Sequence, residues 1–142
     1  MSHIAKVKIE IKSLDDLARA CQRIGLELVV GQTTFYETSP KYARKCKHAI
    51  RPQSPEALQA YNTAVVEYGL RACQFPFGVK AKRGGGFEVV FESMTGSYCG
   101  PVAAELRKSY AAVAAIGAAR RQGFRVQESR LQTGEIKLVF SK

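Results

Sequence analysis

The stretch of this sequence that most suggests chemistry is a run of cations at positions 41–51. It contains five lysines and arginines, one histidine and one tyrosine, but no acidic residue. Lysine and arginine can pair with phosphates, and an aromatic ring can stack on a base, a contact worth roughly 1 to 3 kcal/mol. The alternative is a solvated loop that happens to be basic. The candidate nucleic-acid-binding residues in this run are Lys41, Tyr42, Arg44, Lys45, Lys47, His48 and Arg51.

A second basic patch is formed by Lys80, Lys82 and Arg83, directly before three glycines at 84–86. One interpretation is a cationic hairpin tip that enters a groove or touches a phosphate backbone. The alternative is that the lysines form the wet face of a strand and the glycines only make a loop. The glycine run is not the phosphate-binding loop of nucleotide hydrolases, because GxxxxGK[ST] is absent and the run joins two predicted strands.

The overall charge agrees with an anionic partner. The 142 residues include 22 Lys and Arg against 12 Asp and Glu, which gives a net charge of +10. The isoelectric point of about 9.7 exceeds the value of about 9 that is typical of nucleic-acid-binding domains. Such a charge favours phosphate contacts that carry little sequence specificity.

Metal and thiol chemistry receive less support. The four cysteines are 25 to 27 residues apart and form no CxxC pair, whereas zinc sites usually draw ligands from closely spaced pairs. Cys99 precedes a predicted helix start, where the helix dipole can activate a thiol, but neither His3 nor His48 has a flanking pattern that predicts a base beside it. We therefore expect reduced thiols, no catalytic residue, no metal and no cofactor; a thiol or zinc enzyme is the third alternative. The cysteines are Cys21, Cys46, Cys73 and Cys99.

Two helix-glycine-strand units provide the scaffold. Ser13 and the acidic residues Asp15 and Asp16 predict a helix over 14–24 that ends at Gly25. A second long helix is predicted to open at Gly100-Pro101 and to end at Gly123. Each glycine accepts the left-handed conformation that lets the chain turn back onto a sheet. Tyr110 and Cys21 fall on the apolar faces of these helices and are predicted to lie in the core.

Alternating residues predict the strands. They cover about 6–12, 26–30 with a continuation towards Tyr36, a hairpin of 77–82 with 87–92, and a final hairpin of 124–131 with 135–140. Residues 37–53 predict a loop with at most a short strand over 46–50, and residues 54–69 predict a helix. The fold expected is a single α+β domain over 1–142, with an antiparallel sheet covered by two main helices in the order β-α-β-(insertion)-β-β-α-β-β and an irregular or helical insertion at about 37–75.

Several short segments together carry a resemblance to a known family. They are Met1-Ser2-His3, the strand 7–12 and the helix that follows it, Ala49-Ile50-Arg51, the strand Gly86 to Val90, and Arg121 to Phe124 through Gly134 to Leu138. In order and spacing this chain resembles domain of unknown function 1257, a conserved hypothetical family of plastid, cyanobacterial and phage genomes. Members usually carry a tryptophan in an acidic turn after the second central strand, where this chain has Glu92 to Gly96 and no tryptophan. The stretch from about Arg51 to Phe75 resembles an insertion relative to shorter members.

The resemblance implies a cytosolic or stromal α+β protein of undefined biochemistry, often encoded near an AAA-type ATPase, and it supplies no catalytic residues. The N-terminal segment has no apolar signal region, so we expect a cytoplasmic protein without a membrane partner. The leading hypothesis is a small, basic, non-enzymatic protein that binds nucleic acid or a ribonucleoprotein. The alternative is an adaptor or regulatory subunit that docks on a protein machine such as an AAA-type ATPase.

Overall fold

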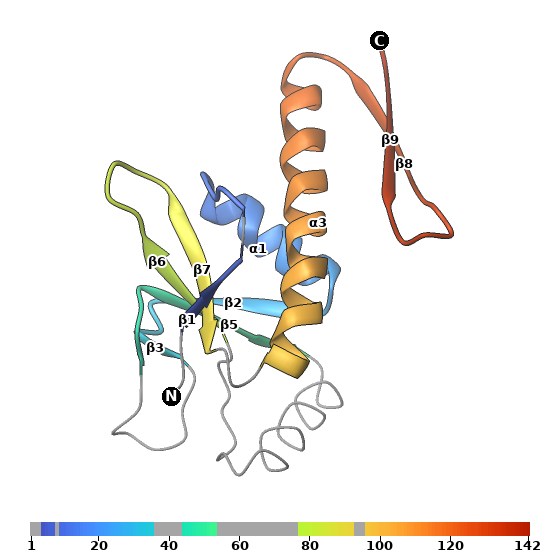
Figure 1. Cartoon of the computed structure of the whole chain (residues 1–142). Coiled ribbons are helices and arrows are strands. Elements are labelled where there is room, and N and C mark those ends of the chain that lie inside the picture. The colour runs from blue at the N-terminus through green and yellow to red at the C-terminus, as the bar shows by residue number, and fades with distance from the viewer. Residues whose placement is uncertain (1–3, 8, 36–43, 54–76, 93–95) are drawn as a thin grey trace.

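The computed structural model describes residues 4–7, 9–35, 44–53, 77–92 and 96–142. Within them the chain forms an α+β fold, as the sequence predicts, and Figure 1 shows its arrangement. The predicted helix over 54–69 lies outside the described residues. The elements are β1 (Ile4–Lys6), α1 (Leu14–Arg23), β2 (Leu26–Val30), β3 (Thr34–Phe35), β4 (Arg44–Lys45), β5 (His48–Pro52), β6 (Phe77–Ala81), β7 (Phe87–Glu92), α3 (Gly96–Arg121), β8 (Arg125–Arg130) and β9 (Ile136–Ser141).

The main sheet has five strands in the order β1-β7-β6-β5-β2, and every neighbouring pair is antiparallel. Helices α1 and α3 pack together on one face of it (Figure 1). The predicted antiparallel sheet with two covering helices is therefore confirmed. Strand β5 lies inside the sheet, although the sequence predicted at most a short strand in a loop. Its neighbours compensate for its weak pattern: Ile50 is opposite Leu28 on one side and Phe77 on the other.

The ends of the two helices follow the predicted chemistry, with one difference. Ser13 Oγ accepts a hydrogen bond of 3.2 Å from the Asp16 amide at the start of α1. Gly25 and Gly123 have φ angles of 76° and 85°, as expected for residues that follow a helix end. Helix α3 begins at Gly96, so the predicted start at Gly100-Pro101 is wrong, and Pro101 lies inside the helix. Pro101 is the sixth residue of the helix, where its fixed φ fits the helix and its missing N–H removes one backbone hydrogen bond.

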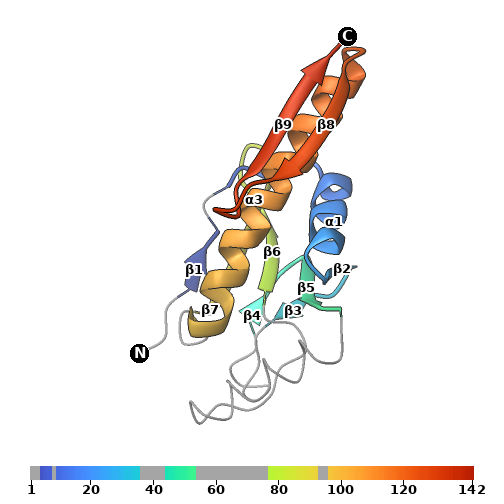
Figure 2. The same cartoon turned by 90° about the vertical axis from the view of Figure 1, so that its right-hand side faces the viewer.

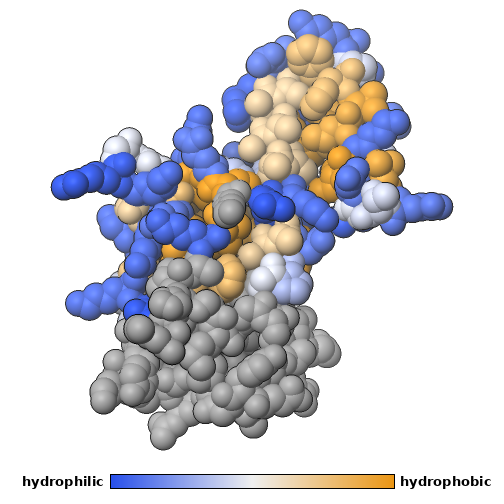
Figure 3. Space-filling model, in the orientation of Figure 1, coloured by the Kyte–Doolittle hydropathy of each residue, from blue (hydrophilic) through white to orange (hydrophobic). Residues whose placement is uncertain are grey.

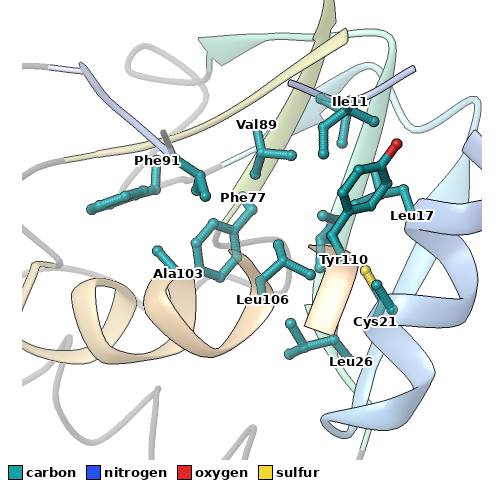
Figure 4. Close-up of a cluster of buried hydrophobic side chains, with 14 of the residues drawn as sticks. Ile11, Leu17, Cys21, Leu26, Phe77, Val89, Phe91, Ala103, Leu106 and Tyr110 are labelled. Carbon is teal, nitrogen blue, oxygen red and sulfur yellow. The ribbon is translucent and has the colours of Figure 1, made fainter. Parts of the chain in front are cut away.

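The hydrophobic core lies between the helices and the sheet (Figure 4). Leu17 and Cys21 enter it from α1, and Leu106 and Tyr110 enter it from α3. The Tyr110 hydroxyl also accepts a 3.0 Å hydrogen bond from the Lys12 amide, just before α1. The expected core positions of Cys21 and Tyr110 are thus confirmed, and Tyr110 ties the start of α1 to α3.

The first strand is shorter than the predicted strand over 6–12 and lies earlier in the chain, so the two share only Lys6. β1 ends at Lys6, and the chain returns to β7 only at Ile11, which forms an isolated bridge with Phe87. The Val7 amide donates a hydrogen bond to the Val89 carbonyl. From Val7 to Ile11 the chain advances four residues, whereas the facing stretch of β7, from Val89 to Phe87, advances two. This bulge lets both Val7 and Ile11 be buried at the edge of the core.

The sheet face opposite the helices is covered in part by β3 and β4, which form a small two-stranded sheet. Phe35 of β3 is 1% exposed and lies over Gly78 of β6. A Cβ atom added at Gly78 would be only 2.4 Å from Phe35 Cδ1, so this glycine makes room for the ring. Ala49 and Val90 are also buried on this face. Gly78 and Ala49, which are small residues in adjacent strands, therefore leave room for the Phe35 ring. This contact holds β3 against the sheet, and β4 is held through its pairing with β3.

The C-terminal hairpin does not join the main sheet. Within the described residues, strands β8 and β9 pair only with each other, and they lie along the C-terminal half of α3 (Figure 2). The predicted hairpin itself is confirmed. No helix in the described part of the chain combines the length and the apolar character that a bilayer crossing requires.

Candidate nucleic-acid interface

Strand β4 and the bend after it carry the first group of candidate cations. Lys45 pairs in register with Thr34, and the Cys46 amide donates a 2.8 Å hydrogen bond to the Thr33 carbonyl. The Lys47 amide donates to the Val79 carbonyl at 2.9 Å, so the bend is fixed against β6. Both Lys45 and Lys47 have exposed side chains.

The β6–β7 hairpin carries the second group. Lys80 is half-buried on β6, while Lys82 and Arg83 are exposed at the tip. The Lys82 amide and carbonyl both take part in short backbone hydrogen bonds across the turn, to Gly86 at 3.0 Å and from Gly85 at 3.2 Å. The turn is thus a closed structure that holds its two cations away from the body of the protein.

The two groups lie beside each other, although about 35 residues separate them in the sequence. The hydrogen bond between Lys47 and Val79 places the bend next to Lys80. The positive charge of Lys80 acts to lower the pKa of the Cys46 thiol, against the larger effect of burial. Figure 3 shows hydrophilic side chains projecting on the side of the molecule where Figure 1 places the β6–β7 tip. We call this surface the basic flank and define it as Lys45, Lys47, Lys80, Lys82 and Arg83.

Carboxylates are scarce on the basic flank. Residues 44–51 and 80–88 include seven lysines and arginines but a single acid, Glu88. Glu88 forms an ion pair with Lys6 at 3.3 Å and stands opposite Lys80 in the sheet. Among the described residues, none of the five flank cations forms an ion pair. Their charge is therefore available to a partner.

Other candidates from the sequence are placed differently. Arg51 is at the far end of β5, where its Nε is 3.0 Å from a carboxylate oxygen of Glu27, and Arg44 is half-buried in β4. His48 is half-buried, its Nδ1 accepts a 3.0 Å hydrogen bond from the Gly31 amide, and its ring centre is 6.2 Å from that of Phe87. These contacts give His48 a packing role. Lys41 and Tyr42 lie outside the described residues.

The structure describes the surroundings of two cysteines, Cys21 and Cys46. Burial raises the pKa of the Cys21 thiol to about 12. Burial also raises the pKa of Cys46, against the opposing effects of a backbone contact at Val79 and the charge of Lys80, and its thiol donates to the Gln32 carbonyl at 3.3 Å. Both shifts disfavour the nucleophilic thiolate. No cluster of metal-ligating side chains occurs in the parts of the chain that the structure describes, and the Cys99 side chain lies outside them.

A further group of cations was not singled out from the sequence. Arg120 and Arg121 are exposed in the last turn of α3, and Arg125 follows at the start of β8. Their position has a simpler explanation, because cations stabilise the carbonyl end of a helix. Farther along, Glu105 lies 3.8 Å from Lys108 and 3.7 Å from Arg130, so part of the charge there is compensated. Periodicity along the helix could have revealed this group, but not its separation from the basic flank.

Comparison of the chain with protein-family models, with curated proteins and with solved structures finds no match.

Proposed function

We propose that this protein binds nucleic acid through phosphate contacts made by the basic flank. The observation that supports the proposal most is the convergence of two separate cationic segments on one surface, without an ion pair to any described carboxylate. A nucleic-acid backbone presents a row of negative charges, and each lysine or arginine that neutralises a phosphate releases a counterion. The affinity gained in this way is largely independent of sequence.

The shape of the flank suits a backbone rather than a buried small ligand. Four of its five cations have exposed side chains, and two of them project on the closed tip of the β6–β7 hairpin. Exposed lysines can follow an extended strand, whereas recognition of a small anion usually requires an enclosed site. Because His48 is engaged within the fold, the proposal relies on phosphate pairing and not on base stacking by that ring.

The test compares two variants with equal charge. The flank variant carries Lys47→Glu, Lys82→Glu and Arg83→Glu, and the control carries Arg107→Glu, Arg121→Glu and Arg125→Glu. All six side chains are exposed, and each set replaces three positive charges by three negative ones, which lowers the net charge by six units, from +10 to +4. Fluorescence anisotropy with a labelled single-stranded oligonucleotide should show that the flank variant binds at least about ten-fold more weakly than the control.

Equal weakening of both variants would reject the flank as the binding surface, and no binding by the unaltered protein would reject the function. Affinity capture from the native cell with and without nuclease separates the alternatives. Partners that are lost after nuclease treatment support a nucleic-acid role. A protein machine retained equally by both variants after nuclease treatment would instead favour an adaptor, as would an AAA-type ATPase in that fraction.

A further inference from the structure

The C-terminal arm, defined as α3 from Lys108 onward together with β8 and β9, has an apolar inner side. Val126, Ile136 and Leu138 lie half-buried between the hairpin and α3. Figure 3 shows apolar surface along this part of α3 and on the side of the hairpin next to it, on the face turned to the viewer. A two-stranded hairpin packed on one helix leaves part of its apolar face uncovered.

The two outer edges of the hairpin differ in their protection. On β8, Glu128 forms an ion pair with Arg23 of α1, and Arg130 approaches Glu105 of α3. These inward-facing charges secure β8 and protect its edge from pairing. The β9 sequence is Ile-Lys-Leu-Val-Phe-Ser, and no residue of β9 forms an ion pair within the described part of the chain. Among described strands β9 pairs only with β8, so no described strand occupies its other edge.

A cleft of about 370 Å³ runs between α3 and β9. No residue of β8 contributes to it, so it lies on the side of the unprotected strand. Of the four large hydrophobic side chains that are exposed in the described residues, three belong to the hairpin: Leu131 at 43%, Val139 at 45% and Phe140 at 45%. The residues that line the cleft are Lys108, Ala111, Ala112, Glu135, Ile136 and Leu138.

We propose that the occupant of this edge is a second copy of the chain, with β9 of each copy pairing antiparallel across a twofold axis. The product is a four-stranded sheet, β8-β9-β9-β8, that covers two antiparallel α3 helices. The small, exposed side chain of Ala111 beside β9 lets the two helices approach closely. The two main sheets lie at opposite ends of the joined arms, so they do not collide.

The sequence of β9 suits pairing with itself in one register. When the twofold axis passes through Val139, the two Val139 side chains meet on the outer face and Leu138 lies opposite Phe140 on the inner face. Lys137 then faces Ser141, which keeps the two lysines apart. Lys142 then lies opposite Ile136 of the other copy, whereas a parallel, in-register arrangement would place the two Lys137 side chains next to each other.

The first test measures the mass of the full-length chain by light scattering over a range of concentrations. A species of twice the 15.6 kDa chain mass should form as the concentration rises. Val139→Lys places two lysines face to face at the axis and should raise the dimer dissociation constant about ten-fold or more. Because this side chain is on the solvent face of the hairpin, the thermal midpoint of the folded chain should change little. A monomer at every soluble concentration, or a dimer unaffected by Val139→Lys, would overturn the proposal.

A cysteine at the axis provides an independent test. Val139→Cys should give a covalent dimer on treatment with diamide, which oxidises two thiols to one disulfide. Leu131→Cys is the matched control, because its exposure is similar but it lies in the hairpin turn, and it should cross-link no more than the unaltered protein does through its native cysteines. Equal cross-linking of the two variants would place the contact elsewhere and reject the β9 pairing.

Discussion

At the scale of single residues, burial decides which chemistry the side chains can do. Cys21 has an accessible fraction of 0% in the core and a thiol pKa of about 12, so it is a packing residue. Ser109 is the one polar residue among the buried side chains of the described part, and its hydroxyl donates a 2.8 Å hydrogen bond to the Ala20 carbonyl. A buried polar group is stable when it is paired in this way. Both residues therefore contribute to the packing of α1 and α3, and neither is accessible as a reactive group.

The pKa of Cys21 predicts a loss of stability at high pH. Between the ordinary value of 9.0 and the folded value of about 12, the unfolded chain releases this proton while the folded chain retains it. The unfolded state then binds fewer protons, so the free energy of unfolding falls as pH rises, by up to about 4 kcal/mol over the whole window. Urea denaturation at several pH values between 8 and 11 measures the effect.

Cys21→Ala is the control for the other groups that titrate in this range. The variant should be less stable than the unaltered protein at pH 8, because the substitution leaves a small cavity. The difference between their free energies of unfolding should become smaller as the pH rises. A difference that stays constant up to pH 11 would show that the buried thiol is not the cause.

At the scale of elements, the seating of β3 on the sheet positions the basic flank. Phe35 over Gly78 fixes β3, β3 pairs with β4, and the bend after β4 holds Lys47 against β6. The cations of the flank are therefore part of a folded layer. A change at the contact of Phe35 with Gly78 is expected to disturb both stability and the position of Lys45 and Lys47.

Gly78→Ala tests this contact. The added methyl would be 2.4 Å from the Phe35 ring, and overpacking of this kind costs about 1 to 3 kcal/mol in the free energy of unfolding. Gly100→Ala is the matched control, because no atom lies within 4 Å of its added Cβ, and it should be neutral or slightly stabilising in α3. In chemical denaturation, combining Gly78→Ala with Phe35→Leu should cost less than the sum of the single changes. Simple additivity would contradict the proposed clash.

The elements that could be predicted from the sequence are those whose pattern is local. Ser13, Gly25 and Gly123 mark helix ends through their own hydrogen bonds and backbone angles, and the turn of each hairpin contains glycine with a positive φ. Strand β5 was predicted only as at most a short strand over 46–50, because its five residues show no clear alternation and its stability comes from neighbours on both sides. The bulge after Val7 likewise depends on pairing with β7, which is distant in the sequence. The helical turn before Pro101 was missed because no residue type in it marks the start of a helix.

The candidate site was predictable in composition but not in geometry. The sequence identifies Lys45, Lys47, Lys82 and Arg83 as cations without indicating that β6 brings them together. It also cannot show that Glu27 pairs with Arg51, or that His48 accepts a hydrogen bond from the backbone. Such assignments require the register of β2, β5 and β6, which long-range packing determines. Membership of domain of unknown function 1257 stays a prediction.

At the scale of the whole molecule, the basic flank and the C-terminal arm lie on different sides (Figure 1). The main sheet, α1 and the part of α3 before Lys108 form the body between them. This separation means that phosphate binding and self-association can be altered independently. A net charge of +10 also attracts anions to every face, so only a comparison of charge-matched surfaces identifies the one in contact.

The most direct test of the account is the salt dependence of binding to a single-stranded oligonucleotide. The slope of log K against log salt reports how many phosphates the protein neutralises, at about −0.7 for each. The unaltered protein should give a slope of about −2 to −4. The variant with Lys47→Glu, Lys82→Glu and Arg83→Glu should lose about two units of this slope, and the variant with Arg107→Glu, Arg121→Glu and Arg125→Glu should retain it. Equal slopes for the three proteins would contradict the claim that the basic flank holds the backbone.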